Sequence, residues 1–159
     1  MLLSKKTILP NRKSIRMKDW DYSSPWWYFV TININTGSFG LLKDGIVEYN
    51  RLGKKVDKEW SDIPLYYSET ELDDYIIMPD HIHGIVIIEA ENKQKPHTLG
   101  NILGSFKSSI TKWAHENDYK KFKWQKRFFD RIIRNEQELY KIRRYIELNP
   151  LKKEIELDF

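Results

Sequence analysis

The segment that most constrains the fold is YIIMPDHIHGIVIIE at residues 75–89, which places His81 and His83 two residues apart in an apolar run. The run reads as strand, apart from a break at Pro79-Asp80. Successive strand side chains point to opposite faces, so the two imidazoles share one face. Side by side they can bind a metal ion or clamp a phosphate. Two ordinary surface histidines on a half-exposed strand would give the same pattern.

The rest of the sequence predicts one small α+β domain. The expected elements are a strand at 26–34, hairpin strands at 39–42 and 46–49 around Asp44-Gly45, a helix at 52–67, strands at 74–78 and from 81, a helix from 99, a strand at 128–133 and a helix at 136–149. Pro64 can end the first helix early. This order is a split βαβ pattern, which predicts a ferredoxin-like sandwich with an antiparallel sheet and an appended C-terminal helix. Residues 1–22 are interpreted as a basic N-terminal arm and residues 23–159 as the domain.

Composition excludes some kinds of site and favours others. Cysteine is absent from the 159 residues, which excludes disulfides, thiolate metal sites and cysteine nucleophiles. The formal net charge of +4 is unevenly spread, because residues 57–74 are acid-rich whereas residues 120–134 are basic and hold four aromatic side chains. Basic side chains interleaved with aromatic ones suit a polyanion with stackable bases. A solvated basic face with its aromatic side chains turned inward is the other explanation.

Hydropathy gives no reason to expect a membrane partner. The apolar runs are far shorter than the span of a bilayer. The first residues lack the apolar core of a signal peptide. We therefore expect a cytoplasmic protein.

The final helix, EQELYKIRRYIELN at 136–149, contains a second group of candidate residues. Leu139, Ile142 and Ile146 form its buried stripe. Tyr145 and Asn149 are four residues apart and border that stripe together, so they can project into one cleft. A tyrosine at the edge of the core and an asparagine that caps the helix would give the same spacing.

Taken together, these motifs resemble the single-tyrosine HUH nucleases, named for two histidines around an apolar residue. The sequence looks most like the REP-associated tyrosine transposases within that superfamily. The resemblance covers nearly the whole chain, through YFVTI at 28–32, MPDHIHGI at 78–85, SFKSSITKW at 105–113, WQKRFFDRIIRNEQEL at 124–139 and YIELNP at 145–150. Asp80 stands where relatives often have asparagine.

The resemblance implies a metal-dependent single-stranded DNA endonuclease and strand transferase that cuts near hairpin-forming repeats through a 5′-phosphotyrosine. Tyr145 would be the nucleophile, and His81, His83 and Asn149 would hold one divalent cation, Mg²⁺ or Mn²⁺. Asp80 is a candidate to orient an imidazole, although it is equally a turn residue after a proline. The candidates for DNA contacts are Lys107, Lys126, Arg127, Arg131, Lys141 and Arg144. For Lys107, a solvated helix face is the simpler explanation.

The partner implied by the resemblance is single-stranded or hairpin DNA, and a monomer is favoured over a homodimer. Two alternatives remain at this stage. One is a DNA-hairpin binding module that has lost its chemistry. The other is a metal-dependent hydrolase or RNA-binding α+β domain in which Tyr145 is structural.

Overall fold

The computed structural model describes residues 26–89 and 97–151. The predicted N-terminal arm at 1–22 lies outside the described residues. The elements are β1 (Trp27–Thr36), β2 (Gly40–Lys43), β3 (Ile46–Tyr49), α1 (Arg51–Ser61), α2 (Ile63–Tyr66), β4 (Thr70–Ile77), β5 (His81–Ile88), α3 (Leu99–Glu116), β6 (Lys123–Trp124), β7 (Phe129–Ile132) and α4 (Glu136–Leu148). None of the described helices is long and apolar enough to cross a membrane.

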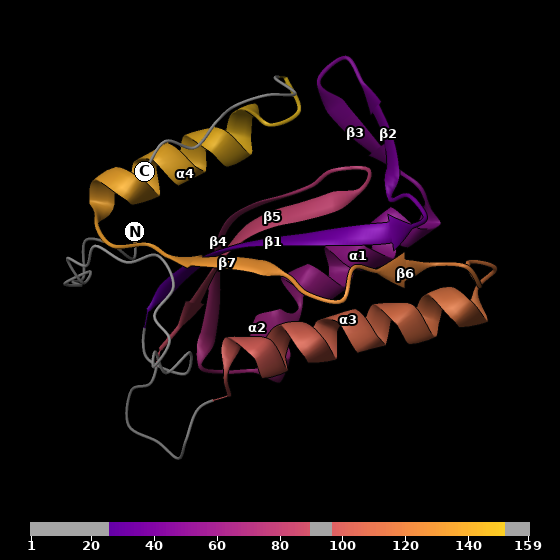
Figure 1. Cartoon of the computed structure of the whole chain (residues 1–159), viewed down its shortest axis with the longest axis horizontal. Helices are drawn as coiled ribbons and strands as arrows, with labels where there is room; N and C mark the ends of the chain where they lie inside the picture. Colours follow the sequence, from indigo (N-terminus) through magenta and orange to yellow (C-terminus); the bar gives the residue numbers. More distant parts are fainter. Residues whose placement is uncertain (1–25, 90–96, 152–159) are drawn as a thin grey trace.

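The centre of the fold is a five-stranded sheet built around β1 (Figure 1). On one side β1 pairs antiparallel with β5, which pairs antiparallel with β4. On its other side β1 pairs antiparallel with both β6 and β7. The predicted ferredoxin-like arrangement with an antiparallel sheet is confirmed.

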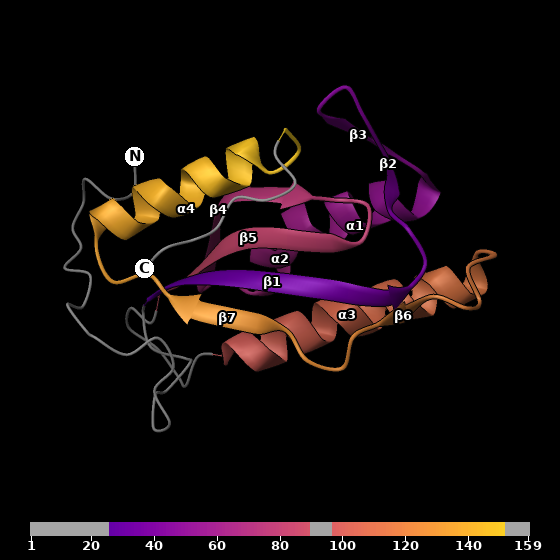
Figure 2. The same cartoon turned by 45° about the horizontal axis from the view of Figure 1, so that its top comes forward.

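The two faces of the sheet support separate cores, because apolar side chains of β1 and β5 point to both faces. One face is covered by α1 and α3, and the other by α4 (Figures 1 and 2). Gly84 allows the α1 side to pack closely, since a Cβ there would lie 2.4 Å from Cζ2 of the buried Trp60. The stripe predicted for the last helix, Leu139, Ile142 and Ile146, is buried on the α4 side.

The structure differs from the predicted elements at three places. The helix expected at 52–67 is divided into α1 and α2 at Asp62, and Pro64 lies in the first turn of α2, where a missing N–H is tolerated. Strand β4 begins at Thr70, four residues before the predicted start, and contains an irregularity between Leu72 and Tyr75. Strand β6 was not expected, because two residues carry no periodic signal.

The predicted hairpin is present as β2 and β3. Its turn residues Asp44 and Gly45 have φ angles of 50° and 76°. Two positive φ angles are typical of the type I′ turn that matches strand twist. The hairpin reaches the end of α4, where a Cβ on Gly45 would lie 2.4 Å from Cδ2 of Leu151.

Candidate active site

Strand β5 holds the two histidines on the face that α4 covers. In register with β1, His81 lies opposite Asn33 and His83 opposite Thr31. The two imidazole ring centroids are 4.6 Å apart. His83 is buried, at 5% exposed, and the His81 side chain is 21% exposed. The pair is therefore built into the domain and is not a feature of a half-exposed strand.

Each imidazole has a hydrogen-bond partner at Nδ1. His83 Nδ1 lies 2.8 Å from Thr31 Oγ1, and His81 Nδ1 lies 2.6 Å from Asp80 Oδ1. When Nδ1 donates its hydrogen to such a partner, the lone pair is on Nε2, which is the arrangement common in metal-binding histidines. The structure thus places Asp80 where it can orient His81. Thr31 has the same position towards His83, and no motif in the sequence indicates this role.

Burial keeps His83 in the neutral form that can bind a metal. Burial, together with the neighbouring His81, lowers the pKa of His83 from 6.5 to about 3, although Asp80 acts in the opposite direction. An imidazole must be unprotonated at the ligating nitrogen to bind a cation. His83 is therefore ready for a ligand throughout the neutral pH range.

Tyr145 of α4 lies over His83, the buried member of the histidine pair. Its hydroxyl oxygen is 3.4 Å from Nε2 of His83. The Tyr145 ring packs edge-on against the rings of His83 and Phe29. Residues from the two halves of the sequence, 62 positions apart, thus meet at one point. The phenol hydroxyl and Nε2 of His83 share this point, which is a suitable arrangement for attack at an electrophile bound there.

An ion pair that the sequence did not reveal fixes α4 on the sheet. Arg143 donates from Nε and Nη2 to the two carboxylate oxygens of Asp73 on β4, at 2.7 and 2.6 Å. This hydrogen bond raises the pKa of Arg143. A bidentate contact of this kind is strong and directional. It holds the helix two residues before Tyr145 and so limits where the phenol can lie.

Asn149 occupies the C-cap of α4, one turn beyond Tyr145, and is 9% exposed. The described residues contain no group of three or more His, Cys, Asp or Glu side chains that could hold a metal ion. Among the described residues, a third protein ligand beside His81 and His83 would be of another type, and a carboxamide oxygen is suitable. Two imidazole nitrogens with oxygen ligands fit Mn²⁺ or Mg²⁺ and leave positions for water or phosphate.

Five of the six predicted DNA contacts fall into three groups. Lys141 and Arg144 are exposed on α4, and Arg144 forms a loose pair with Glu147 at 3.5 Å. Lys126 and Arg127 are exposed before β7. Lys107 of α3 is partly buried, and burial lowers its pKa.

The prediction that Arg131 contacts DNA is wrong. Arg131 is 3% exposed on the α4 side of β7, and its Nη2 lies 3.3 Å from Oε1 of the buried Glu138. Glu138 also accepts hydrogen bonds from the side chain and the backbone N–H of Arg134. A predicted DNA contact by Arg131 is not compatible with this position. The cause is the alternation of β7, which turns Arg131 inward to neutralise a carboxylate at the start of α4.

Comparison with known proteins gives consistent results. A family model described as "Transposase IS200 like" matches residues 51–149, which include the histidine pair and Tyr145. An uncharacterized protein of Haemophilus influenzae is 32% identical over 160 residues, covering 89% of each chain. A solved structure of a REP-associated tyrosine transposase bound to a REP hairpin superposes with a TM-score of 0.62 at 18% identity, covering 89% of this chain and 74% of that one. That likeness confirms the fold.

Proposed function

Because this chain belongs to the IS200-like transposase family, we propose that it is a metal-dependent nuclease and strand transferase for single-stranded DNA, with Tyr145 as its nucleophile. One observation carries the proposal. The Tyr145 hydroxyl lies 3.4 Å from Nε2 of His83, beside the second imidazole of the pair. A tyrosine that only packs at the edge of the core has no need of a buried histidine beneath its hydroxyl.

The residues have separate roles in this reaction. The Tyr145 oxygen attacks the phosphorus, the Tyr–O–P bond forms, and the bond from phosphorus to the 3′ oxygen of the preceding nucleotide breaks. The Tyr145 phenol gives up its proton and the leaving 3′ oxygen takes one up, so the products are a 5′-phosphotyrosine and a free 3′-hydroxyl. The new ester keeps the energy of the broken bond, so a 3′-hydroxyl of another strand can reverse the step without ATP.

Lys141 lies one helical turn before Tyr145 and Arg144 is adjacent to it, so both can place positive charge near a phosphate that is bound at the site. His81, His83 and Asn149 would hold the divalent cation. When bound, the cation would supply Lewis-acid stabilisation of charge on the non-bridging phosphate oxygens.

We also propose that one chain is sufficient for cleavage. His83 and Tyr145 belong to the same chain here, and the Arg143–Asp73 pair fastens α4 to its own sheet. A mixture of His83→Ala and Tyr145→Phe separates the possibilities, because a dimer with exchanged helices would rebuild one intact site. We expect the mixture to stay inactive at all protein ratios. Recovered cleavage would show that α4 acts in the partner.

The proposed substrate is a DNA hairpin with single-stranded flanks. The structural relative is described as bound to a REP hairpin, and this supports the same class of partner for a chain with the same fold. The DNA sequence can be sought in repeats that flank the gene.

The test incubates labelled hairpin DNA from those repeats with Mn²⁺, Mg²⁺ or EDTA, and separates products on a denaturing gel. Wild type should give a cleaved strand and a slow-migrating protein–DNA adduct that require the metal. Tyr145→Phe should give neither and still bind the DNA. Tyr140→Phe is the matched control, because Tyr140 is on the same helix and is 65% exposed. Tight binding by wild type with no cleavage in any metal would support the binding-module alternative.

A further inference from the structure

A groove on the α3 side of the sheet is a second surface suited to DNA. It lies between α3 and the segment that leads from β6 into β7, away from α4 (Figure 1), and has a volume of about 610 Å³. Its lining includes Gly100, Gly104, Lys107, Lys112, Lys126 and Phe128. None of the described residues that line it is acidic. A groove with this lining attracts a polyanion.

Two glycines keep one side of the groove open. Gly100 and Gly104 lie one turn apart on the exposed side of α3, where glycine destabilises a helix relative to alanine. A Cβ on Gly104 would meet no described atom within 4 Å, and a Cβ on Gly100 would meet only Thr98 Oγ1 at 3.8 Å. Packing within the described residues therefore requires neither glycine. Their absence of side chains leaves room for a bulky ligand against the helix.

Contacts across the groove hold its two sides together. Lys107 Nζ donates to the carbonyl oxygen of Gln125 at 2.8 Å and lies 6.0 Å from the centre of the Trp124 ring. In return, Trp124 Nε1 donates to the carbonyl oxygen of Lys107 at 3.0 Å. The groove is thus formed before any ligand arrives, and its positive charge lies beside an aromatic ring.

The edge strand connects this groove to the histidine pair. Phe128 lines the groove, whereas Phe129 lies opposite Thr31 in register, on the face that carries His83. Neighbouring residues of an extended chain point to opposite sides. Phe129 is 48% exposed. An aromatic ring is therefore available on each side of the sheet edge at β7, and bases of a single strand stack well on such rings.

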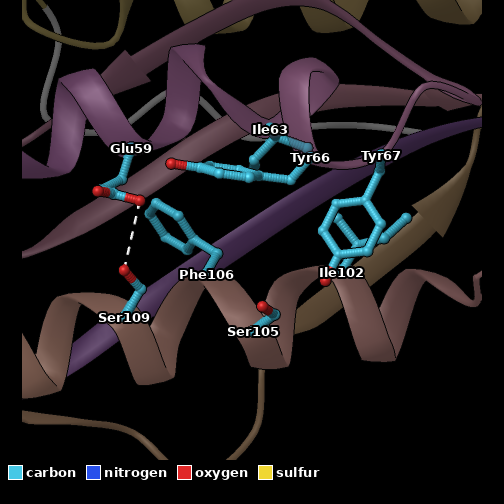
Figure 3. A pocket seen from close by; sticks show the side chains of 8 residues that line it. All are labelled: Glu59, Ile63, Tyr66, Tyr67, Ile102, Ser105, Phe106 and Ser109. Atoms are coloured by element: carbon cyan, nitrogen blue, oxygen red, sulfur yellow. Dashed lines mark hydrogen bonds between the residues drawn. The ribbon is translucent and has the colours of Figure 1, made fainter.

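The opposite side of α3 has a different character. A smaller pocket there contains the Glu59 carboxylate, whose Oε2 accepts a hydrogen bond from Ser109 at 3.3 Å, with Ser105 nearby (Figure 3). A carboxylate repels phosphate. The two sides of one helix thus provide a test surface and a matched control surface.

We propose that the groove binds the backbone of a single DNA strand, with phosphates at Lys107, Lys112 and Lys126 and a base against Phe128. The inference rests on the proposed function in one respect, because the bound strand is taken to continue round the β7 edge to Tyr145. The groove then holds nucleotides that do not react, and their binding energy positions the strand at the cleavage site.

The experiment compares Gly104→Glu with Ser105→Glu, both in a Tyr145→Phe background so that binding is measured without chemistry. Kd is measured over a range of salt concentrations by fluorescence anisotropy of a labelled single-stranded oligonucleotide. The oligonucleotide has about 20 nucleotides, which exceeds the site size of about 4–16 nucleotides of a single OB fold. Gly104→Glu should raise Kd at least about tenfold. It should also make the negative slope of log association constant against log salt concentration shallower by about 1.4, which corresponds to the loss of two phosphate contacts. Ser105→Glu adds the same charge at a position that lines the smaller pocket with Glu59, where the proposal places no phosphate, and should change Kd by no more than about twofold.

Folding is monitored in the same samples. Removal of a helix glycine should raise the Tm of Gly104→Glu by about 2–4 °C, so weaker binding cannot be attributed to unfolding. Equal weakening in both variants, or none in either, would overturn the proposal. So would failure of the parent protein to bind single strands at low salt, or tighter binding of duplex DNA.

The outcomes also separate this proposal from the proposed function. A metal-dependent adduct in wild type together with unchanged binding by Gly104→Glu rejects only the groove. Selective loss of binding in Gly104→Glu, with no adduct from wild type under any condition, rejects only the cleavage.

Discussion

The ion pair between Arg143 and Asp73 should control both stability and catalysis, because it joins the helix that carries Tyr145 to the sheet that carries the histidines. The two side chains are 23% and 12% exposed, and both hydrogen bonds are short. Replacement of Arg143 by methionine keeps the aliphatic stem and removes the charge. It also leaves Asp73 beside Asp74, whose pKa is already raised by burial and by Asp73.

The expected magnitude follows from the burial of the pair. An exposed ion pair contributes about 0.2–1 kcal/mol, whereas removing one partner of a fully buried pair costs about 3–5 kcal/mol. A mostly buried, bidentate pair lies between these limits, so Arg143→Met should lower the free energy of unfolding by about 2 kcal/mol. For a chain of this size that is a fall in Tm of about 4–8 °C. Displacement of the nucleophile should slow single-turnover cleavage by about tenfold to a hundredfold.

The assay is a double-mutant cycle with Arg143→Met and Asp73→Asn, measured by guanidinium unfolding followed through tryptophan fluorescence. The coupling energy should be about 1.5–2 kcal/mol, as for hydrogen bonds between charged groups. The matched control is the Arg144–Glu147 pair of the same helix, whose side chains are 52% and 67% exposed. Its coupling should not exceed about 0.5 kcal/mol.

Cleavage is measured on folded protein at saturating DNA, so that the rate reports the position of Tyr145 and not the folded fraction. A coupling energy near zero for Arg143 and Asp73 would refute the argument from burial. A full coupling energy with an unchanged cleavage rate would refute the link from this anchor to the nucleophile.

Two further predictions concern packing and pH. In guanidinium unfolding, Gly84→Ala should destabilise the fold by about 1–3 kcal/mol, because the new Cβ would lie 2.4 Å from Trp60. Gly104→Ala should stabilise the fold by about 0.5–1 kcal/mol, because its new Cβ would meet no described atom within 4 Å. Burial opposes ionisation of Glu138, yet hydrogen bonds from Arg134 and the nearby charges hold its pKa below the ordinary value of 4.5. Because the pKa of Glu138 is lower in the folded state, its carboxylate stabilises the protein above pH 4.5, and this stabilisation is lost as the pH falls through the folded-state pKa. The Tm difference between wild type and Glu138→Gln should therefore be largest near neutral pH and shrink on acidification. A constant Tm difference would contradict this.

Much of the fold was predictable because local signals decide it. Strand β1 and helices α3 and α4 have clear periodicities, and Asp44-Gly45 specifies its turn. The prediction was wrong where a local signal was weak or where tertiary contacts outweighed it. β4 begins early in an acid-rich segment that composition alone would leave in a loop, and it does so because Thr70, Glu71 and Leu72 pair with Ile88, Ile87 and Val86 of β5.

The individual candidates of the site were also visible in the sequence, but their contacts were not. Spacing placed His81 and His83 on one face and put Tyr145 at the margin of the buried stripe. That the phenol lies over His83 depends on how α4 packs on the sheet. Arg131 shows the converse error, because its place in a basic segment predicts surface exposure, whereas strand alternation turns the guanidinium towards Glu138.

Thr31 illustrates why such contacts resist prediction from sequence. It lies 52 residues from His83, and its hydroxyl reaches Nδ1 only because β1 and β5 pair with Thr31 opposite His83. A shift of one residue would bring Val30 or Ile32 opposite His83, and both are buried on the α1 and α3 side. That shift would also move the whole apolar set of β1 to the wrong face. The core therefore selects the register, and the register supplies the hydrogen bond that orients the histidine. The site geometry is a consequence of packing energy spread along two whole strands, and no short motif contains it.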